Sequence, residues 1–136
     1  MDQALIRQRS AAARVARLAT VTPDGRPHIV PCCFAVDGDC AFTAVDDIKA
    51  KTTRDLRRLR NLLAHPAVSL LIDHYVEDWS ALWWIRMDGR AHLAEHGSTE
   101  HIHAQEVLAS KYDQYRRRPP PGAVVVVEID TWRAWP

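Results

Sequence analysis

The residues with the clearest potential for binding chemistry are two lysines at the start of a predicted helix. Lys49 and Lys51 follow a strand-like run and two aspartates, and Thr52 comes next. The first turn of a helix carries free N–H groups and the positive end of the helix dipole, so cations are disfavoured there unless an anion binds beside them. Asp46 or Asp47 can cap the helix, which leaves Lys49, Lys51 and Thr52 as a predicted phosphate site. The alternative is that both lysines point into solvent.

The cysteines and histidines form no familiar metal or disulfide motif. Cys32 and Cys33 are adjacent and Cys40 stands apart, so we expect reduced thiols rather than a disulfide framework. His101 and His103 are the tightest histidine pair, but residues two apart on a helix do not share a face. We therefore expect no bound metal. The sequence also lacks a Ser/His/Asp arrangement and a glycine-rich Rossmann motif, which disfavours a hydrolase or an NAD-dependent dehydrogenase.

Composition and charge narrow the class of protein. The chain has 136 residues, 47% apolar content and a net charge of +1, which predicts one domain over residues 1–136. No segment has the length of a membrane span or the apolar core of a signal peptide, so we expect a cytoplasmic protein without membrane contact. The basic segments 53–61 and 116–118 suggest nucleic-acid binding as an alternative, but near-neutral charge and the lack of interleaved aromatics argue against it.

The hydrophobic pattern predicts a mainly β protein with helices (α+β), built as a small barrel of six strands with helices outside. Pro31 cannot donate to a strand ladder, so its strand is expected at an edge or at a bulge. The last strand is almost continuously apolar and is therefore expected to be central. The predicted strands cover 15–21, 28–36, 40–45, 68–73, 81–93 and 123–129, and the predicted helices cover 3–13, about 49–64 and 99–115.

Two further expectations concern side chains. In the helix over 49–64, Leu56, Leu59, Leu62 and Leu63 are spaced to share an apolar side. The proline-rich segment over 116–122 is expected to be an exposed loop.

Several short motifs occur in a characteristic order along most of the chain. They are Leu18-Ala19-Thr20-Val21, Asp24-Gly25-Arg26-Pro27-His28, Asp37-Gly38-Asp39, Lys49-Ala50-Lys51-Thr52 and His65-Pro66-Ala67-Val68. Together they resemble the pyridoxamine 5′-phosphate oxidase-like split barrels, of the FMN-binding split-barrel type. The Lys-Ala-Lys-Thr motif and the segment 78–84 are similar to an actinobacterial branch assigned to the deazaflavin coenzyme F420. Flavin-binding oxidases of the superfamily tend to have Ser-Arg-Lys-Ala at the helix start, and this chain departs from that pattern.

The resemblance implies a homodimer with a cofactor at the subunit interface. It implies an oxidoreductase that transfers a hydride between coenzyme F420 and a small organic acceptor, the small-molecule substrate. An FMN-dependent enzyme of the same fold and a non-catalytic flavin, deazaflavin or haem carrier are the alternatives. The cofactor-binding residues implied are Lys49, Lys51, Thr52, Thr43, Ala44 and Val45 near the phosphate, His28, Val30, Pro31 and Cys32 near the ring, Arg57 or Arg58 near carboxylates of the tail, and Trp79.

Both arginines and the tryptophans have structural alternatives. Arg57 and Arg58 would also suit a solvated helix face. Trp79, Trp84 and Trp135 belong to a set of five tryptophans, and large aromatics most often fill a core or an interface. The functional alternative is that at least one of these three contacts cofactor or substrate. Trp83 and Trp84 are adjacent in a predicted strand and must face opposite ways.

Overall fold

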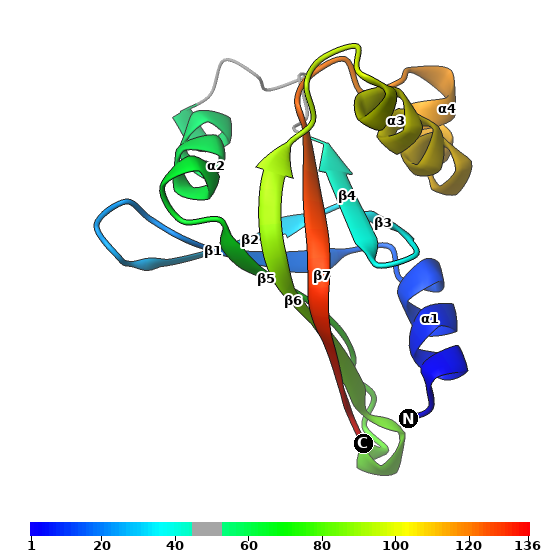
Figure 1. Ribbon diagram of the computed structural model, residues 1–136. Helices are drawn as coiled ribbons and strands as arrows, with labels where there is room; N and C mark the ends of the chain where they lie inside the picture. Colours follow the sequence, from blue (N-terminus) through cyan, green and yellow to red (C-terminus); the bar gives the residue numbers. More distant parts are fainter. Residues whose placement is uncertain (45–52) are drawn as a thin grey trace.

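A curled antiparallel sheet forms the body of the molecule (Figure 1). The computed structural model describes residues 1–44 and 53–136. Within these residues the sheet has seven strands in the order β2-β1-β5-β6-β7-β4-β3. The strands are β1 (Ala16–Val21), β2 (Pro27–Cys32), β3 (Ala35–Asp37), β4 (Cys40–Ala44), β5 (Ala67–His74), β6 (Trp83–Leu93) and β7 (Val124–Trp135).

Helices cover the sheet and its ends. They are α1 (Gln3–Ala12), α2 (Thr53–Ala64), α3 (Thr99–Lys111), α4 (Asp113–Arg117) and the short 3-10 helix η2 (Trp79–Ala81). The described helices are all too short or too polar to cross a membrane. The predicted start of the second helix, at about residue 49, lies outside the described residues.

The sheet is a half-closed barrel because the chain joins its two edges directly. β2 and β3 are the opposite edge strands, yet only Cys33 and Phe34 separate them in the sequence. This link spans at most about 11 Å, so the sheet must curl until its edges approach each other. The single strand predicted over 28–36 is therefore wrong, because its two halves pair with β1 and with β4. Among the described residues, seven strands replace the predicted six.

The central position predicted for the last strand is confirmed. β7 lies between β6 and β4, and Val124 to Val127 are all buried on both faces of the sheet. Val125 and Val127 belong to the core inside the barrel. Val124 and Val126 pack in a second cluster with residues of α3. The edge position predicted for the Pro31 strand is also confirmed, since β2 ends the sheet.

Some predicted boundaries and faces are wrong. Leu62 is buried in the core, but Leu63 is 76% exposed, because the apolar face of α2 is narrower than the leucine spacing suggests. β6 begins at Trp83 rather than at residue 81, after η2. β7 continues to Trp135 instead of ending at Ile129, because β6 is long enough to pair with it throughout.

The helix predicted over 99–115 is divided at Tyr112. Tyr112 has an extended backbone between α3 and α4. Its hydroxyl accepts a hydrogen bond from the Phe34 N–H at 3.0 Å. The same hydroxyl lies 2.9 Å from the carbonyl oxygens of Phe34 and Arg14. These long-range contacts outweigh local helix propensity. Arg116 and Arg117, predicted in a loop, end α4, since the prolines that exclude a helix begin only at residue 119.

Candidate functional site

The inward face of β2 carries three of the predicted ring-side residues. His28, Val30 and Cys32 each pair with a buried residue of β1. Side chains alternate along a strand, so these three share the face toward the core. Pro31 lies on the other face and is exposed. The structure therefore brings together three of the four residues predicted on this strand.

α2 packs against this part of the sheet through a buried hydrogen bond. The side-chain amide of Asn61 donates to the Thr20 hydroxyl at 3.1 Å, and both residues are buried. Thr20 is the β1 partner of His28. Arg58 precedes Asn61 by three residues and therefore lies on the same side of the helix. Its Nε is completely buried.

Thr43 of β4, the neighbour of the opposite edge strand β3, reaches the same region. Thr43 is only 1% exposed, and its hydroxyl lies beside the Cys32 thiol. Burial raises the pKa of Cys32, and the Thr43 hydroxyl and the Arg58 charge oppose this effect only in part. Residues of β2, β4 and α2 thus meet where the two edges of the sheet approach each other.

Three buried polar atoms in this region lack a partner. Among the described residues, His28 Nδ1, Thr43 Oγ1 and Arg58 Nε form no hydrogen bond. We call His28, Thr43 and Arg58 the polar cluster: Thr43 and Arg58 both act on the Cys32 thiol, and His28 lies four residues before Cys32 on the same face of β2. A buried polar group without a partner costs about 1–3 kcal/mol. Arg58 Nε can only donate, and the threonine hydroxyl can donate as well. This donor set suits an oxyanion such as a phosphate.

The structure describes only some of the other residues predicted near the phosphate. Ala44 is buried at the end of β4, next to Thr43. Val45, Lys49, Lys51 and Thr52 lie outside the described residues, so the predicted lysine site stays a prediction. Arg57 is exposed at the border of the buried face of α2. Sequence reasoning named Arg57 and Arg58 as equivalent choices, and only the buried Nε of Arg58 distinguishes them.

Trp79 lies far from the polar cluster of its own chain. It belongs to η2, between β5 and β6, and is 69% exposed. α2 leads into the opposite end of β5 (Figure 1). The eight residues of β5 span about 25 Å. Tyr75 and Trp135 are also exposed, and Tyr75 contacts Trp79 through its hydroxyl. We call Tyr75, Trp79 and Trp135 the exposed aromatic group.

The adjacent tryptophans of β6 face opposite ways, as predicted. Trp83 packs against the core, with the Arg9 guanidinium 4.6 Å from its ring centroid. Trp84 pairs across the sheet with Trp135. Its side chain lies beside Arg86, whose guanidinium is 6.0 Å from the ring centroid. Trp84 is therefore on the face away from the core.

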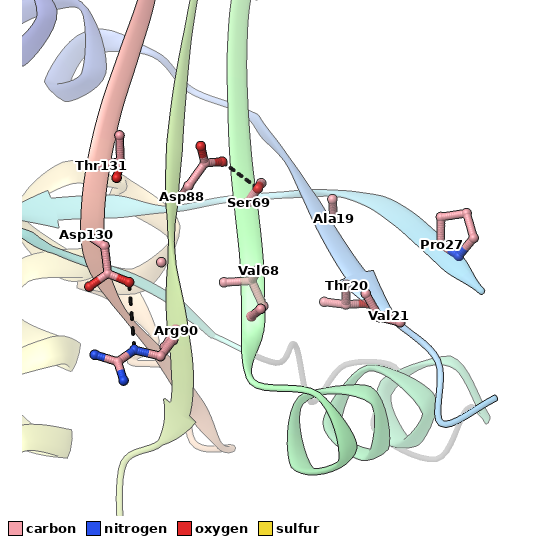
Figure 2. Close-up of a pocket in the computed structure, with 12 residues that line it drawn as sticks. Ala19, Thr20, Val21, Pro27, Val68, Ser69, Asp88, Arg90, Asp130 and Thr131 are labelled. Atoms are coloured by element: carbon pink, nitrogen blue, oxygen red, sulfur yellow. Dashed lines mark hydrogen bonds and ion pairs between the residues drawn. The ribbon is translucent and has the colours of Figure 1, made fainter. Parts of the chain in front are cut away.

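A recess of about 520 Å³ lies on the sheet (Figure 2), and its lining includes Thr20, the β1 partner of His28, but no residue of the polar cluster. Figure 2 shows Ser69 facing Asp88, and Arg90 facing Asp130. The Ser69 hydroxyl donates to Asp88 at 2.6 Å, and Arg90 lies 3.7 Å from Asp130. These polar groups already pair with one another, so few are free for a ligand. Sequence reasoning missed this recess because its lining residues form no local motif.

Lys111 is a second buried cation that sequence reasoning missed. Its Nζ is 3.9 Å from the Phe34 ring centroid and 5.4 Å from that of Tyr112. Within the described chain this nitrogen is buried and has no hydrogen-bond partner. Burial lowers the pKa of Lys111 to about 8, and the Arg14 charge acts in the same direction. As the last residue of α3, Lys111 carries no signal in the local sequence.

We predict that Lys111 makes the protein more stable as the pH rises above about 8. Its pKa falls from an ordinary 10.5 to about 8 on folding. Between these values the unfolded chain binds more protons, so the free energy of unfolding increases with pH. Because the side chain is only partly buried, we expect a gain of about 1 kcal/mol. Urea unfolding gives the free energy of unfolding of the natural protein and of Lys111→Met at about pH 7.5 and about pH 9.5. The gain is the increase with pH in the natural protein minus the increase in Lys111→Met. If the two proteins differ by the same free energy at both pH values, the prediction is contradicted.

Comparison with known proteins identifies the family. A family model described as pyridoxamine 5′-phosphate oxidase matches residues 3–136. The chain belongs to this family. A search of curated proteins finds no match.

Solved structures share the fold at low sequence identity. A conserved hypothetical protein from Mycobacterium tuberculosis is 22% identical with a TM-score of 0.78, over 99% of this chain and 84% of that chain. An FAD-binding protein from Mesorhizobium loti is 20% identical with a TM-score of 0.72, over 98% of this chain and 94% of the other. The haem storage protein HutZ from Vibrio cholerae is 17% identical with a TM-score of 0.72, over 97% and 89%. These similarities show the curled-sheet fold and do not distinguish among ligands.

Proposed function

We propose that this protein is an oxidoreductase that transfers a hydride between coenzyme F420 and a small organic acceptor. The observation that carries the proposal is the polar cluster, which leaves Arg58, Thr43 and His28 with buried unpaired atoms. An anionic ligand would satisfy these atoms, and a phosphate is common to FMN and coenzyme F420. The polar cluster therefore supports a cofactor with a phosphate, in the part of the fold where the resemblance predicts one.

Charge favours coenzyme F420 over FMN. A deazaflavin coenzyme carries a phosphodiester and a polyglutamate tail, and so offers more negative charge than a nucleotide monophosphate. Arg58 would hold the phosphate, and exposed Arg57 lies one residue earlier for a tail carboxylate. Lys49 and Lys51 stay predicted phosphate ligands. Affinity for coenzyme F420 should exceed affinity for FMN, and the margin should shrink as salt increases.

The chain's own residues would orient the cofactor and exclude water. When bound, the deazaflavin ring supplies the hydride. Val30 and Cys32 offer an apolar wall beside the polar cluster, because the raised pKa of Cys32 keeps its thiol neutral near pH 7. A neutral thiol at this place acts by contact rather than as a nucleophile. Fixed orientation of ring and acceptor is then the main catalytic contribution of the protein.

A homodimer accounts for the exposed aromatic group. Tyr75, Trp79 and Trp135 expose large apolar surface at the end of the β5–β6 hairpin, and Trp79 is remote from its own polar cluster. We propose that a second copy of the chain covers this group, so that Trp79 contacts the cofactor held by the partner's α2.

Mixed dimers test this arrangement. We expect homodimers of Arg58→Gln and of Trp79→Ala both to bind coenzyme F420 weakly. Random mixing of the two variants should restore about a quarter of the sites, because half of the dimers are mixed and each contains one site without a mutation. The double variant mixed with itself is the control and should restore none. The mixtures must first be shown to exchange subunits. If binding then does not recover, either Trp79 and Arg58 belong to the same chain's site or Trp79 belongs to no site.

Cofactor titration tests the function itself. The purified protein is titrated separately with coenzyme F420, FMN and haem, and reduced coenzyme F420 is then offered with a panel of enones and quinones. We expect the tightest binding for coenzyme F420, and faster oxidation of the bound than of the free cofactor. Preference for FMN would favour an enzyme of the same fold with that cofactor. Tight binding of haem, or deazaflavin binding without accelerated oxidation, would favour a carrier, the role that the name of HutZ states for that relative.

A further inference from the structure

α1 lies against the sheet beside the turn between β3 and β4 (Figure 1). The buried residues of this helix are Ile6 and Ser10, and of these only Ile6 belongs to the hydrophobic core. The Ser10 hydroxyl donates to the Ile6 carbonyl at 2.8 Å, so this bond stays within the helix and does not attach it to the sheet. One large apolar side chain therefore anchors the ten residues of α1 in the core.

Arg7 joins α1 to the turn between β3 and β4 and to β7. Its guanidinium donates to the Gly38 carbonyl and to the Asp39 carboxylate, the latter at 2.6 Å. It also lies 4.2 Å from the ring centroid of Trp132, whose Nε1 donates to Asp39 at 3.1 Å. The hydrogen bond from Arg7, followed by that from Trp132, holds the pKa of Asp39 below its ordinary value. This attachment is therefore present at neutral pH and is lost as the pH falls through the pKa of the folded state.

Arg9 makes a second attachment on another side of the helix. Residues two apart on a helix do not share a face, and the Arg9 guanidinium lies over Trp83 of β6, 4.6 Å from its ring centroid. Trp83 and Trp132 are both partly buried against the core. The side chains of Arg7 and Asp39 are 39% and 68% exposed, so salt screens their ion pair. Most of the attachment of α1 thus depends on charge rather than on apolar burial.

We propose that α1 is a strap that opens as a unit while the sheet stays folded, and that Arg7 and Arg9 hold it closed through their charges. Segments with few buried apolar contacts open more readily than core strands. A helix of ten residues is only marginally stable by itself in water, so α1 unfolds when it leaves the sheet. Opening uncovers Trp83 and Trp132. This inference goes beyond the proposed function and does not depend on a bound cofactor.

Hydrogen exchange of the full-length protein without added cofactor tests the strap, because the exchange rate of a protected amide reports how often its segment opens. At neutral pH we expect the amides of α1 to exchange at least about a hundredfold faster than those of β6. Raising the salt from about 0.05 M to about 1 M should speed exchange in α1 about threefold and leave β6 unchanged. Arg7→Gln should speed exchange in α1 about tenfold and remove most of the salt response, because it removes the ion pair and the cation over Trp132.

Two further variants complete the test. Arg9→Gln should speed exchange in α1 about threefold while β6 stays protected. Arg26→Gln removes an exposed cation between β1 and β2 and should leave exchange in α1 unchanged. Equal exchange of α1 and β6 in the natural protein would overturn the strap, since α1 would then open only when the whole chain unfolds. Equal effects of Arg7→Gln and Arg26→Gln, or equal acceleration of α1 and β6 in Arg7→Gln, would overturn the role of the two arginines.

Discussion

Arg58→Gln is expected to weaken the binding of coenzyme F420 by about ten- to a hundredfold, since a charge-assisted hydrogen bond is worth about 1.5–3 kcal/mol. Arg58 Nε has no hydrogen-bond partner among the described residues. Because this nitrogen can only donate, it needs an acceptor such as a phosphate oxygen. Glutamine keeps much of the side-chain length and removes the charge. Isothermal titration calorimetry of the natural protein and the variant measures the difference. FMN should lose affinity as well, because the phosphate is common to both ligands.

Arg60→Gln is the matched control. Arg60 has the same charge and lies two residues after Arg58 on the same helix, but it is exposed. An exposed charge contributes little, so we expect less than about a threefold loss of affinity. Because Arg58 Nε lacks a hydrogen bond, Arg58→Gln should not lower the melting temperature. Equal losses in the two variants would indicate a general effect of positive charge. Unchanged affinity in Arg58→Gln would remove the polar cluster as the cofactor site.

Gly89→Ala is expected to destabilise the protein by about 2–4 kcal/mol. A Cβ at Gly89 would lie 2.0 Å from the Glu128 carbonyl oxygen and 3.0 Å from the Ile129 Cα. Both contacts are with the backbone of β7, which cannot retreat without breaking its ladder with β6. The register between the strands shifts at this place, next to Asp130. Chemical denaturation in urea measures the loss.

Gly97→Ala separates steric contact from backbone preference. Gly97 has a φ of +78° and no atom within 4 Å of an added Cβ. Alanine in this conformation costs about 1 kcal/mol through backbone strain alone. We therefore expect Gly89→Ala to be the more harmful change by at least about 1 kcal/mol. Equal stability of the two variants would show that β6 and β7 can separate at the register shift without a large cost.

The sequence alone determined the features that depend on local patterns. A nearly continuous apolar run predicted that β7 is central, and burial of Val124 to Val127 on both faces of the sheet confirms it. Pro31 predicted an edge strand or a bulge because proline cannot donate to a ladder, and β2 is an edge. The prediction placed Pro31 with His28, Val30 and Cys32 on the ring side, whereas the alternation along β2 places Pro31 on the opposite face. The order of short motifs predicted the family that the comparison then identified.

Only the tertiary structure decided the features that depend on distant partners. No local pattern shows that Cys33 and Phe34 join the two edges of the sheet, because the halves of the predicted strand differ only in their partners, β1 and β4. Tyr112 divides a helix-like segment because its hydroxyl bonds to backbone groups of Arg14 and Phe34. Such contacts become possible only after the sheet has curled.

The same reason explains the candidate site. The sequence pointed to Thr43, Cys32 and the arginines of α2, but it could not distinguish Arg58 from Arg57. That distinction depends on which face of α2 packs against β1, set by the buried hydrogen bond between Asn61 and Thr20. The sequence by itself thus determined which residue types and strand faces are available for a site. Packing between distant segments decided which polar atoms are buried without partners, because burial depends on what the folded chain places around each group.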